Sequence, residues 1–586
     1  MKQLMQILSE QLSAAFAAAG YAAEYGQVRV SDRPDLCEYQ CNGAMAAAKA
    51  YHKAPFVIAE DVLKCVGEDA AFTASAVKPG FLNLDVKPAY LASYLSRMAY
   101  EGASVPADEQ KKKIIIDYGG PNVAKPLHVG HLRSAVIGES LKRILRAVGH
   151  EVYGDIHLGD WGLQIGLVIT ELRARHPELP YFDEQADSYP EEAPFTVSEL
   201  EEVYPCASEK SKTDEAYREE ALKATFDLQS GKPGYRALWQ KILEVSVADL
   251  KRNYERLDVH FDLWKSESDA QAYIPGVIET LKEKGLARED QGALVVDVTE
   301  ETDKKEMPPC IILKSDGASL YSTTDIATIV ERMKLFAPDE IIYVVDKRQA
   351  MHFEQVFRVV RKADMVAPET KLFFAGFGTM NGRDGKPFKT REGGVMRLER
   401  LLDEIEETMT GKIAENRNVR ASDAADTARQ VALAAVKYGD LSNQAIKDYI
   451  FDPEKFTSFE GNTGPYILYT LVRIKSILEK CGEEDKKALL APQLLPPAGE
   501  EEKALMLSLT DFGQVVSDAA HELAPHRICA YIYRVSNECN RFYHGTKILS
   551  EEDASRRVSY LALIRLAGQI LEKCIDLLGF TAPEHM

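Results

Sequence analysis

The stretch GGPNVAKPLHVGHLRS, residues 119–134, decides the fold class because it joins two segments with different hydrophobic patterns. The apolar run Ile114–Ile116 precedes it and is typical of a short buried strand. After it, apolar residues recur at helical spacing up to Gly149, and Pro126 is tolerated in a first helical turn. The sequence therefore predicts a strand, a turn and a helix, the repeating unit of parallel sheets.

The same alternation of strands and helices continues along the chain. EVYGDIHL (151–158), DEIIYVVD (339–346) and KLFFAGFG (371–378) are predicted as buried strands, with a helix over 350–363. Residues 285–298 have the pattern of a hairpin. We therefore expect a Rossmann-like, doubly wound parallel sheet.

Changes in these patterns divide the chain into regions. Residues 1–110 are predicted to form a small α+β domain. Residues 111–400 are predicted to form the sheet domain, with an acidic and mostly helical insertion at about 170–300. Only helical periodicity follows, so we expect a helical connector over 401–455 and an all-helical C-terminal domain over 456–586.

Within the N-terminal region, a helical start leads to AAEYGQVRVS (22–31), and PFVIAEDVL (55–63) is interpreted as strand-like. GFLNLDV (80–86) is the last of these segments and alternates as an edge strand does.

Composition restricts the class of protein. The chain has no uninterrupted apolar run of about 18 residues, so we expect no membrane contact. The nine cysteines are scattered, which favours free thiols in a reducing cytoplasm, and Cys37-x3-Cys41 lacks a second ligand pair, so we expect no metal site and no structural zinc. The net charge of −20 argues against sequence-blind binding of nucleic acid but permits a local basic face.

Two histidines, His128 and His131, flank Gly130 at the predicted start of the helix. Four interpretations compete: a metal site, a structural helix cap, general acid–base catalysis and phosphate binding. No carboxylate or cysteine nearby completes a metal ligand set. A helix N-terminus at the carboxyl edge of a parallel sheet attracts anions, and Lys125 adds a cation. We therefore expect phosphate binding, although neither common glycine-rich nucleotide loop is present.

His128–His131 resembles the HIGH signature of class I aminoacyl-tRNA synthetases. The wider strings PNVAKPLHVGHLRS (121–134) and GDIHLGDWGLQIG (154–166) resemble arginyl-tRNA synthetases of the bacterial type. The resemblance spans most of the chain, in order. It includes FDLWKSES (261–268), LYSTTDIAT (320–328), YVVDKRQAMHFEQVF (343–357) and FTSFEGNTGPYILYTLVRIKSIL (456–478).

This resemblance implies a ligase that activates L-arginine with ATP and transfers it to the 3′ end of tRNA(Arg). It also implies that tRNA binds before arginine is activated. ATP would bring its own Mg²⁺, which keeps most of its waters and needs no protein cage. In the family, the C-terminal helical domain binds the anticodon and the N-terminal domain contacts the tRNA elbow. We expect a monomer.

The second signature of the family, K-M-S-K-S, is altered in this chain to NGRDGKPFKTREGG (381–394). Its first lysine is displaced to Lys386 or lost, and the resemblance implies that Lys125 compensates. The implied catalytic residues are Lys125, His128, His131, Lys389 and Arg391. The implied ATP-binding residues are Lys125, His128, Gly130, His131, Lys386 and Lys389.

An arginine pocket needs carboxylates, because a planar guanidinium pairs with them through two parallel hydrogen bonds. By resemblance, the residues that contact arginine are Asn122, Glu267, Tyr321, Asp325 and Gln349. Four residues are expected to border the same cleft without an assigned role: His157, Asp160, Trp161 and Gln164.

Residues 527–547 combine cations with aromatic rings, a mixture that suits unstacked RNA. The alternative is a helix with an aromatic core face. The residues are Arg527, Arg534, Arg541 and Lys547 with Tyr531, Tyr533, Phe542 and Tyr543.

Two other functions remain open. One is a small-molecule adenylyltransferase. The other is a non-catalytic tRNA-binding relative, which would be expected to lose its phosphate-contacting residues.

Overall fold

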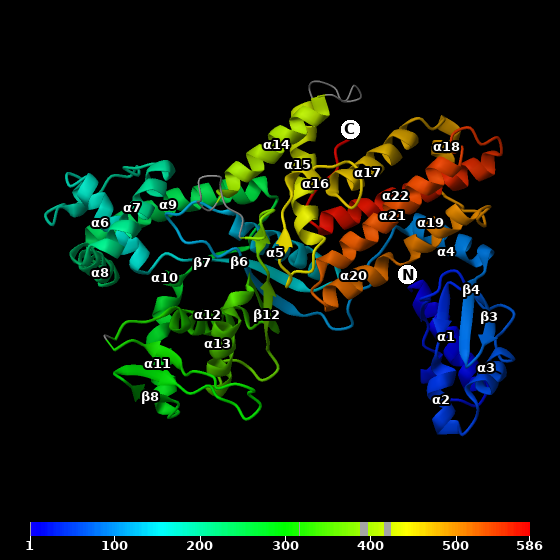
Figure 1. Cartoon of the computed structure of the whole chain (residues 1–586), viewed down its shortest axis with the longest axis horizontal. Helices are drawn as coiled ribbons and strands as arrows, with labels where there is room; N and C mark the ends of the chain where they lie inside the picture. Colours follow the sequence, from blue (N-terminus) through cyan, green and yellow to red (C-terminus); the bar gives the residue numbers. More distant parts are fainter. Residues whose placement is uncertain (1, 316, 387–395, 415–422) are drawn as a thin grey trace.

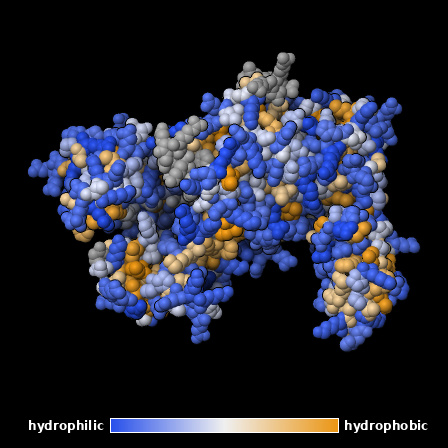
Figure 2. Space-filling model, viewed as in Figure 1, coloured by the Kyte–Doolittle hydropathy of each residue, from blue (hydrophilic) through white to orange (hydrophobic). Residues whose placement is uncertain are grey.

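The computed structural model describes residues 2–315, 317–386, 396–414 and 423–586. The molecule is elongated, and the N-terminal domain projects from one end of it (Figure 1). The parallel sheet lies near the centre, between the helices of the insertion and those of the C-terminal region (Figure 1). Hydrophilic residues cover most of the face shown in Figure 2, and hydrophobic ones form small separate groups.

The N-terminal region is an antiparallel four-stranded sheet, in the order β1-β2-β4-β3, packed against helices. On α1, Leu8, Leu12 and Phe16 recur every four residues and are fully buried, so one helical face supplies the core. The elements are α1 (Leu4–Ala18), η1 (Ala23–Gly26), β1 (Arg29–Val30), β2 (Tyr39–Cys41), α2 (Gly43–Tyr51), α3 (Pro55–Leu63), β3 (Phe72–Val77), β4 (Phe81–Val86) and α4 (Pro88–Glu101).

Two predictions for this region are wrong. Residues 55–63 form the helix α3 rather than a strand, because Pro55 occupies the first turn and Ile58 and Val62 bury one helical face. A short apolar run has no periodicity that separates a buried strand from a buried helix. Strand β4 is interior rather than at the edge, since it pairs with both β2 and β3.

The central sheet has five parallel strands in the order β12-β11-β5-β6-β7, which confirms the predicted fold class. Successive residues of β5 face opposite sides: Ile114 and Ile116 belong to one core, and Ile115 belongs to another. Helices therefore cover both faces. The elements are β5 (Lys113–Tyr118), α5 (Val129–Ala147), β6 (Glu151–Leu158), α6 (Leu163–Arg175), β7 (Leu263–Ser266), α12 (Tyr321–Phe336), β11 (Glu340–Asp346), η4 (Lys347–Gln349), α13 (Ala350–Lys362) and β12 (Lys371–Phe377).

Helices and a small antiparallel sheet separate β6 from β11 along the chain. The predicted hairpin at 285–298 is confirmed as β8 and β9, and β10 pairs with β9. The elements are η2 (Pro180–Phe182), α7 (Val197–Thr213), α8 (Glu215–Gln229), α9 (Pro233–Arg256), α10 (Glu267–Ala270), η3 (Gln271–Tyr273), α11 (Ile274–Glu283), β8 (Ala287–Asp290), β9 (Ala293–Val296) and β10 (Cys310–Leu313).

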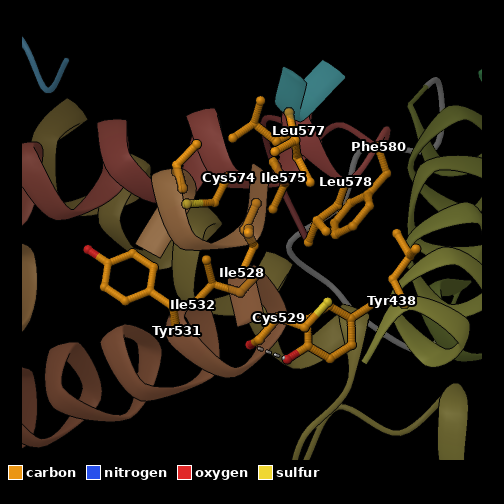
Figure 3. Packing of buried hydrophobic residues seen from close by; sticks show 14 of the residues in the cluster. Tyr438, Ile528, Cys529, Tyr531, Ile532, Cys574, Ile575, Leu577, Leu578 and Phe580 are labelled. Carbon is orange, nitrogen blue, oxygen red and sulfur yellow. Dashed lines mark hydrogen bonds between the residues drawn. The ribbon is translucent and has the colours of Figure 1, made fainter. Parts of the chain in front are cut away.

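The rest of the described chain is helical apart from the short pair β13 and β14. Its core includes Tyr438, whose hydroxyl donates to the carbonyl of Cys529 at 2.9 Å (Figure 3). The elements are β13 (Met380–Asn381), α14 (Leu398–Ala414), α15 (Ala424–Leu441), β14 (Tyr449–Ile450), α16 (Pro453–Phe456), α17 (Gly464–Glu479), α18 (Glu483–Ala488), α19 (Glu500–Thr510), α20 (Phe512–His521), α21 (Pro525–Gly545) and α22 (Ala554–Leu577).

Helix α5 joins the sheet to this helical region. The buried guanidinium of Arg133 donates from Nε to Oδ2 of Asp440 at 3.0 Å, and the hydroxyl of Ser140 donates to the carbonyl of Leu577 at 2.9 Å. The N-terminus of α5, where the paired histidines lie, is therefore fixed relative to the C-terminal helices. No helix among the described residues combines the length and the hydrophobicity needed to cross a bilayer.

Candidate active site

Helix α5 begins with the two histidines in direct contact. His128 is the N-cap, and its Nδ1 accepts the backbone N–H of Gly130 at 3.0 Å. The backbone N–H of His128 donates to Nδ1 of His131 at 3.1 Å, and the two rings lie 3.9 Å apart, centre to centre. Because each Nδ1 accepts a hydrogen bond, each neutral ring carries its proton on Nε2 and can donate it elsewhere.

The surroundings of both rings favour the neutral form. Burial, followed by the proximity of His128, lowers the pKa of His131 to about 3. Burial and the charge of Lys125 also lower the pKa of His128. The pair therefore offers N–H donors to an anion at a helix N-terminus. Capping uses Nδ1 alone, so the structural interpretation and the phosphate interpretation are compatible.

The chain that follows the second signature lies beside these histidines. Backbone hydrogen bonds of 3.1 and 2.8 Å join residues 396–398 to residues 127–129. Within these segments, His128 and Arg397 are antiparallel partners. The first signature and the segment that follows the second, more than 250 residues apart in the chain, therefore meet at the N-terminus of α5.

The structure describes two of the four cations that were predicted near the N-terminus of α5. Lys125 places its ammonium 4.2 Å from the ring centre of Tyr204, a residue of α7 in the insertion. Lys386 is exposed in the turn after β13. Lys389 and Arg391 lie outside the described residues.

Asn122 lies where the chain leaves β5, next to the end of β6. It is the parallel partner of Gly159, whose carbonyl accepts the backbone N–H of Val123 at 3.0 Å. A Cβ at Gly159 would lie 2.1 Å from Oδ1 of Asn122, so any larger residue would displace that side chain. Gln164 donates to the same carbonyl at 3.0 Å, which assigns it a role in holding this loop. His157 contacts the hydroxyl of Thr328 through Nε2 at 3.3 Å.

Three carboxylates from separate elements interact at the carboxyl edge of the sheet. Asp160 follows β6, Glu267 begins α10, and Asp325 lies on α12. Burial, followed by the charges of Asp160 and Asp325, raises the pKa of Glu267 to about 8, and burial raises the pKa of Asp160 to about 6. Within the described part of the chain, no Lys or Arg forms a salt bridge with Glu267 or Asp160. Such a group favours a cationic ligand.

The structure brings one further predicted residue, Tyr321, to this acidic group. Tyr321 begins α12, and the charges of Glu267 and Asp325 add to the burial that raises its pKa. Gln349 is exposed at the end of η4, where β11 has just ended. Sequence reasoning missed His352, whose Nε2 donates to Oδ2 of Asp325 at 2.5 Å. The available signal was its position three residues after Gln349, one helical turn away.

The aromatic and basic segment that was considered for RNA forms α21. Tyr531 and Phe542 are buried in the core, so the alternative interpretation, a core face, is correct for these two. Tyr543 is 40% exposed, and the guanidinium of Arg473 contacts its ring and that of Tyr469, 5.0 and 4.7 Å from the two centres. This group presents rings and positive charge at the surface, as a site for unstacked bases requires.

Three family models match the chain in the order of its regions. Residues 2–86 match the arginyl tRNA synthetase N terminal domain. Residues 95–453 match the catalytic domain of tRNA synthetases class I (R), and residues 467–586 match the DALR anticodon binding domain.

Individual proteins agree with these models. The chain is 59% identical to the arginine–tRNA ligase of Agathobacter rectalis over the whole of both chains. It is 54% identical to that of Alkaliphilus oremlandii over 99% of this chain and all of the relative. The fold matches the arginyl-tRNA synthetases of Plasmodium falciparum (TM-score 0.81, 24% identity, 100% and 99% of the two chains) and Thermus thermophilus (0.79, 24%, all of both). The chain therefore belongs to the arginyl-tRNA synthetase family of class I.

Proposed function

We propose that the chain is an arginine–tRNA ligase that forms arginyl-adenylate from L-arginine and ATP and transfers the arginyl group to tRNA(Arg). One observation carries the proposal: two complementary sites lie at the carboxyl edge of a single parallel sheet. Neutral histidine donors at the N-terminus of α5 suit phosphate, and the group of carboxylates, which has no Lys or Arg partner among the described residues, suits a guanidinium. Full-length relatives of that name support it.

The phosphates of ATP would bind at the N-terminus of α5. His128 and His131 would donate their Nε2 protons to phosphate oxygens, and the exposed Gly130 would allow close approach. Mg²⁺ would arrive with ATP. The cations proposed to neutralise the leaving pyrophosphate are Lys125, Lys386, Lys389 and Arg391.

Arginine would bind across the ends of β5, β6 and α12. Asn122 would hold its amino and carboxyl groups, while Glu267 and Asp325 would receive the guanidinium. Tyr321 and Gln349 would complete the pocket. Two groups of opposite preference on one edge would set the substrate carboxylate in line with the α-phosphorus, and catalysis would come mainly from this positioning and from stabilisation of the developing charge.

The two steps need no protein nucleophile. The carboxylate of arginine attacks the α-phosphorus of ATP, the bond to the β-phosphate oxygen breaks, and pyrophosphate leaves. A terminal ribose hydroxyl of tRNA then attacks the carbonyl carbon of the mixed anhydride, and AMP leaves.

The four predicted regions are proposed to divide these tasks. Residues 1–110 would contact the tRNA elbow, 111–400 would perform the chemistry, 401–455 would connect, and 456–586 would bind the anticodon through a surface that includes Arg473. Bound tRNA would influence arginine activation through α5, which is anchored in the C-terminal helices. We propose a cytoplasmic monomer.

The test is arginine-dependent exchange of labelled pyrophosphate into ATP, measured with and without tRNA(Arg). Exchange that requires arginine and tRNA is the expected result. Exchange without tRNA would retain the ligase and remove the coupling through α5. No exchange with all substrates present would instead favour the non-catalytic tRNA-binding relative, and exchange with a different carboxylic acid, needing no RNA, would favour the small-molecule adenylyltransferase.

A further inference from the structure

Asp160 is a completely buried carboxylate just beyond the end of β6. Its relative exposure is 0%, and among the described residues no Lys or Arg forms an ion pair with it. Both of its carboxylate oxygens are occupied by one residue, Ser268. Oδ1 accepts the backbone N–H at 3.0 Å, and Oδ2 accepts the hydroxyl at 2.7 Å. A buried charge of this kind is costly, so its presence indicates a role that a neutral residue would not fulfil.

Because Glu267 directly precedes Ser268, these hydrogen bonds also fix the position of Glu267. Helix α10 is one turn long and begins at Glu267, so it has little stability of its own. Asp160 attaches this turn to the end of β6. The next residue, Trp161, provides a backbone N–H to the carboxylate of Glu267. Two consecutive residues therefore hold both the backbone and the side chain of Glu267.

The insertion in turn holds these two residues. The indole N–H of Trp239 donates to the carbonyl of Asp160 at 3.0 Å, and Gln229 donates to the carbonyl of Trp161 at 2.8 Å. The rings of Trp161 and Trp239 pack edge to face, 5.3 Å apart between centres. The support is thus built from α8, α9, β6 and α10, and such an outer layer is what keeps a binding group in place.

We propose that Asp160 is a positioning residue for the guanidinium of arginine: through Ser268 it holds Glu267 in place, and it adds a second negative charge behind that carboxylate. The inference rests on the proposed function, in which Glu267 contacts the guanidinium. Once Glu267 is ionised to receive the guanidinium, the cation relieves the repulsion between Glu267 and Asp160. The charge of Asp160 therefore strengthens the binding of arginine and disfavours citrulline, the neutral analogue of the same shape.

Asp160→Asn separates the charge from the geometry. An asparagine can accept the N–H of Ser268 with its amide oxygen and donate to the hydroxyl with its amide nitrogen. In pyrophosphate exchange with tRNA(Arg) at about pH 9, where Glu267 is ionised in both proteins, we expect the KM for arginine to rise about tenfold, and kcat and the KM for ATP to stay within about twofold. Asp297→Asn is the matched control, because Asp297 accepts the backbone N–H and the hydroxyl of Thr299 but is exposed. It should change none of these constants.

Ser268→Ala separates the geometry from the charge, since it removes the hydroxyl and leaves Asp160 ionisable. We expect the KM for arginine to rise about threefold, in line with the loss of one hydrogen bond. Ser268→Thr keeps a hydroxyl at this position and should restore the value.

The pH profile provides a readout that a purely structural role would not move. Glu267 faces Asp160, Asp325 and Tyr321, together with the N–H of Trp161. Without the charge of Asp160, the pKa of Glu267 falls. The pH above which the KM for arginine becomes constant should therefore move down in Asp160→Asn, and remain in place in Asp297→Asn.

The inference is overturned if Asp160→Asn melts like the wild type and its KM for arginine changes less than about twofold. If that variant fails to fold, Ser268→Ala decides: an unchanged KM overturns the positioning role. Glu267→Gln distinguishes this failure from that of the proposed function. If it too leaves the KM for arginine unchanged, the guanidinium binds elsewhere and both proposals fall.

Discussion

Two groups of buried carboxylates lie in the same domain, and they are neutralised differently. In the first, Asp117 of β5 and Asp155 of β6 each accept from Nη2 of Arg332 at 2.5 Å, and Nη1 of this guanidinium donates to the hydroxyl of Tyr343 at 3.0 Å. In the second, Asp160, Glu267 and Asp325 come together with no Lys or Arg partner among the described residues. Helix α12 contributes to both groups, with Asp325 and Arg332 two turns apart.

The difference distinguishes buried charges that support the fold from buried charges that are suited to bind a ligand. Burying a charge costs free energy unless an opposite charge and hydrogen bonds compensate it. In the Arg332 group one guanidinium pairs with two carboxylates, and burial raises the pKa of Asp155 to about 7, so an opposite charge and partial protonation compensate the group within the protein and it is expected to support the sheet. The Glu267 group retains negative charge that a cationic substrate would compensate. Breaking the first should therefore affect stability, and breaking the second should affect the binding of arginine.

The largest effect is expected from Arg332→Leu, which leaves Asp117 and Asp155 buried without a partner. The free energy of unfolding should fall by about 3–5 kcal/mol. All three tryptophans lie between residues 161 and 264, so tryptophan fluorescence during urea unfolding follows this domain. Arg348→Leu is the control, because Arg348 pairs with Asp346 at the surface, and it should cost at most about 1 kcal/mol. Equal stability of the two variants would contradict the structural role.

Glu267→Gln should affect the binding of arginine rather than the stability of the fold. The KM for arginine should rise about 100-fold, because a charge-assisted pair with the guanidinium is lost, while the KM for ATP stays constant. Stability should be unchanged at neutral pH, where Glu267 is already neutral, and higher above about pH 8, where the substitution removes repulsion with Asp160 and Asp325. Pyrophosphate exchange and urea unfolding measure the two quantities. A loss of stability without a change in KM would make this group structural like the first.

The pH dependence of arginine binding sharpens the comparison. Burial and the two neighbouring carboxylates raise the pKa of Glu267 to about 8, so the unbound enzyme holds a proton there at neutral pH. A guanidinium cation binds the ionised form. The KM for arginine should therefore fall by up to about tenfold per pH unit between about pH 6 and 8, and level off above. Glu267→Gln should lack this slope, and a slope that persists in the variant would assign the titration to another group.

A smaller effect than that of Glu267→Gln is expected from His352→Ala, which removes the N–H that holds Asp325. The KM for arginine should rise about fivefold, the value of one hydrogen bond of about 1 kcal/mol. His352→Gln, whose amide can donate to the same oxygen, should recover part of the loss. If the alanine variant changes kcat and not the KM, His352 acts on the chemical step instead.

Local patterns in the sequence were sufficient to predict the parallel sheet. The run at Ile114–Ile116 and the helical stripe after His128 each depend on neighbouring residues, and the fold retains both. The same reasoning was wrong for residues 55–63, because a run of nine residues with Pro55 at its start is compatible with a helix or a strand.

The parts of the site that sequence reasoning did not find are contacts between distant residues. His352 meets Asp325 across 27 positions, and Asp160 meets Ser268 across 108. No spacing rule connects such pairs, because the sheet brings them together only after it has formed. The sequence also could not predict which ring nitrogen of His128 carries the proton, because this follows from the hydrogen bond at Nδ1 rather than from the residue type.

The most direct test of the difference between the two groups is a calorimetric measurement of protons released when arginine binds. Titrations with tRNA(Arg) present and ATP absent, at pH 7 in two buffers of different ionisation enthalpy, give the number. Release of close to one proton per arginine is predicted, because Glu267, with a pKa of about 8, must ionise to receive the guanidinium. Arginine binding of normal affinity without proton release would contradict the account.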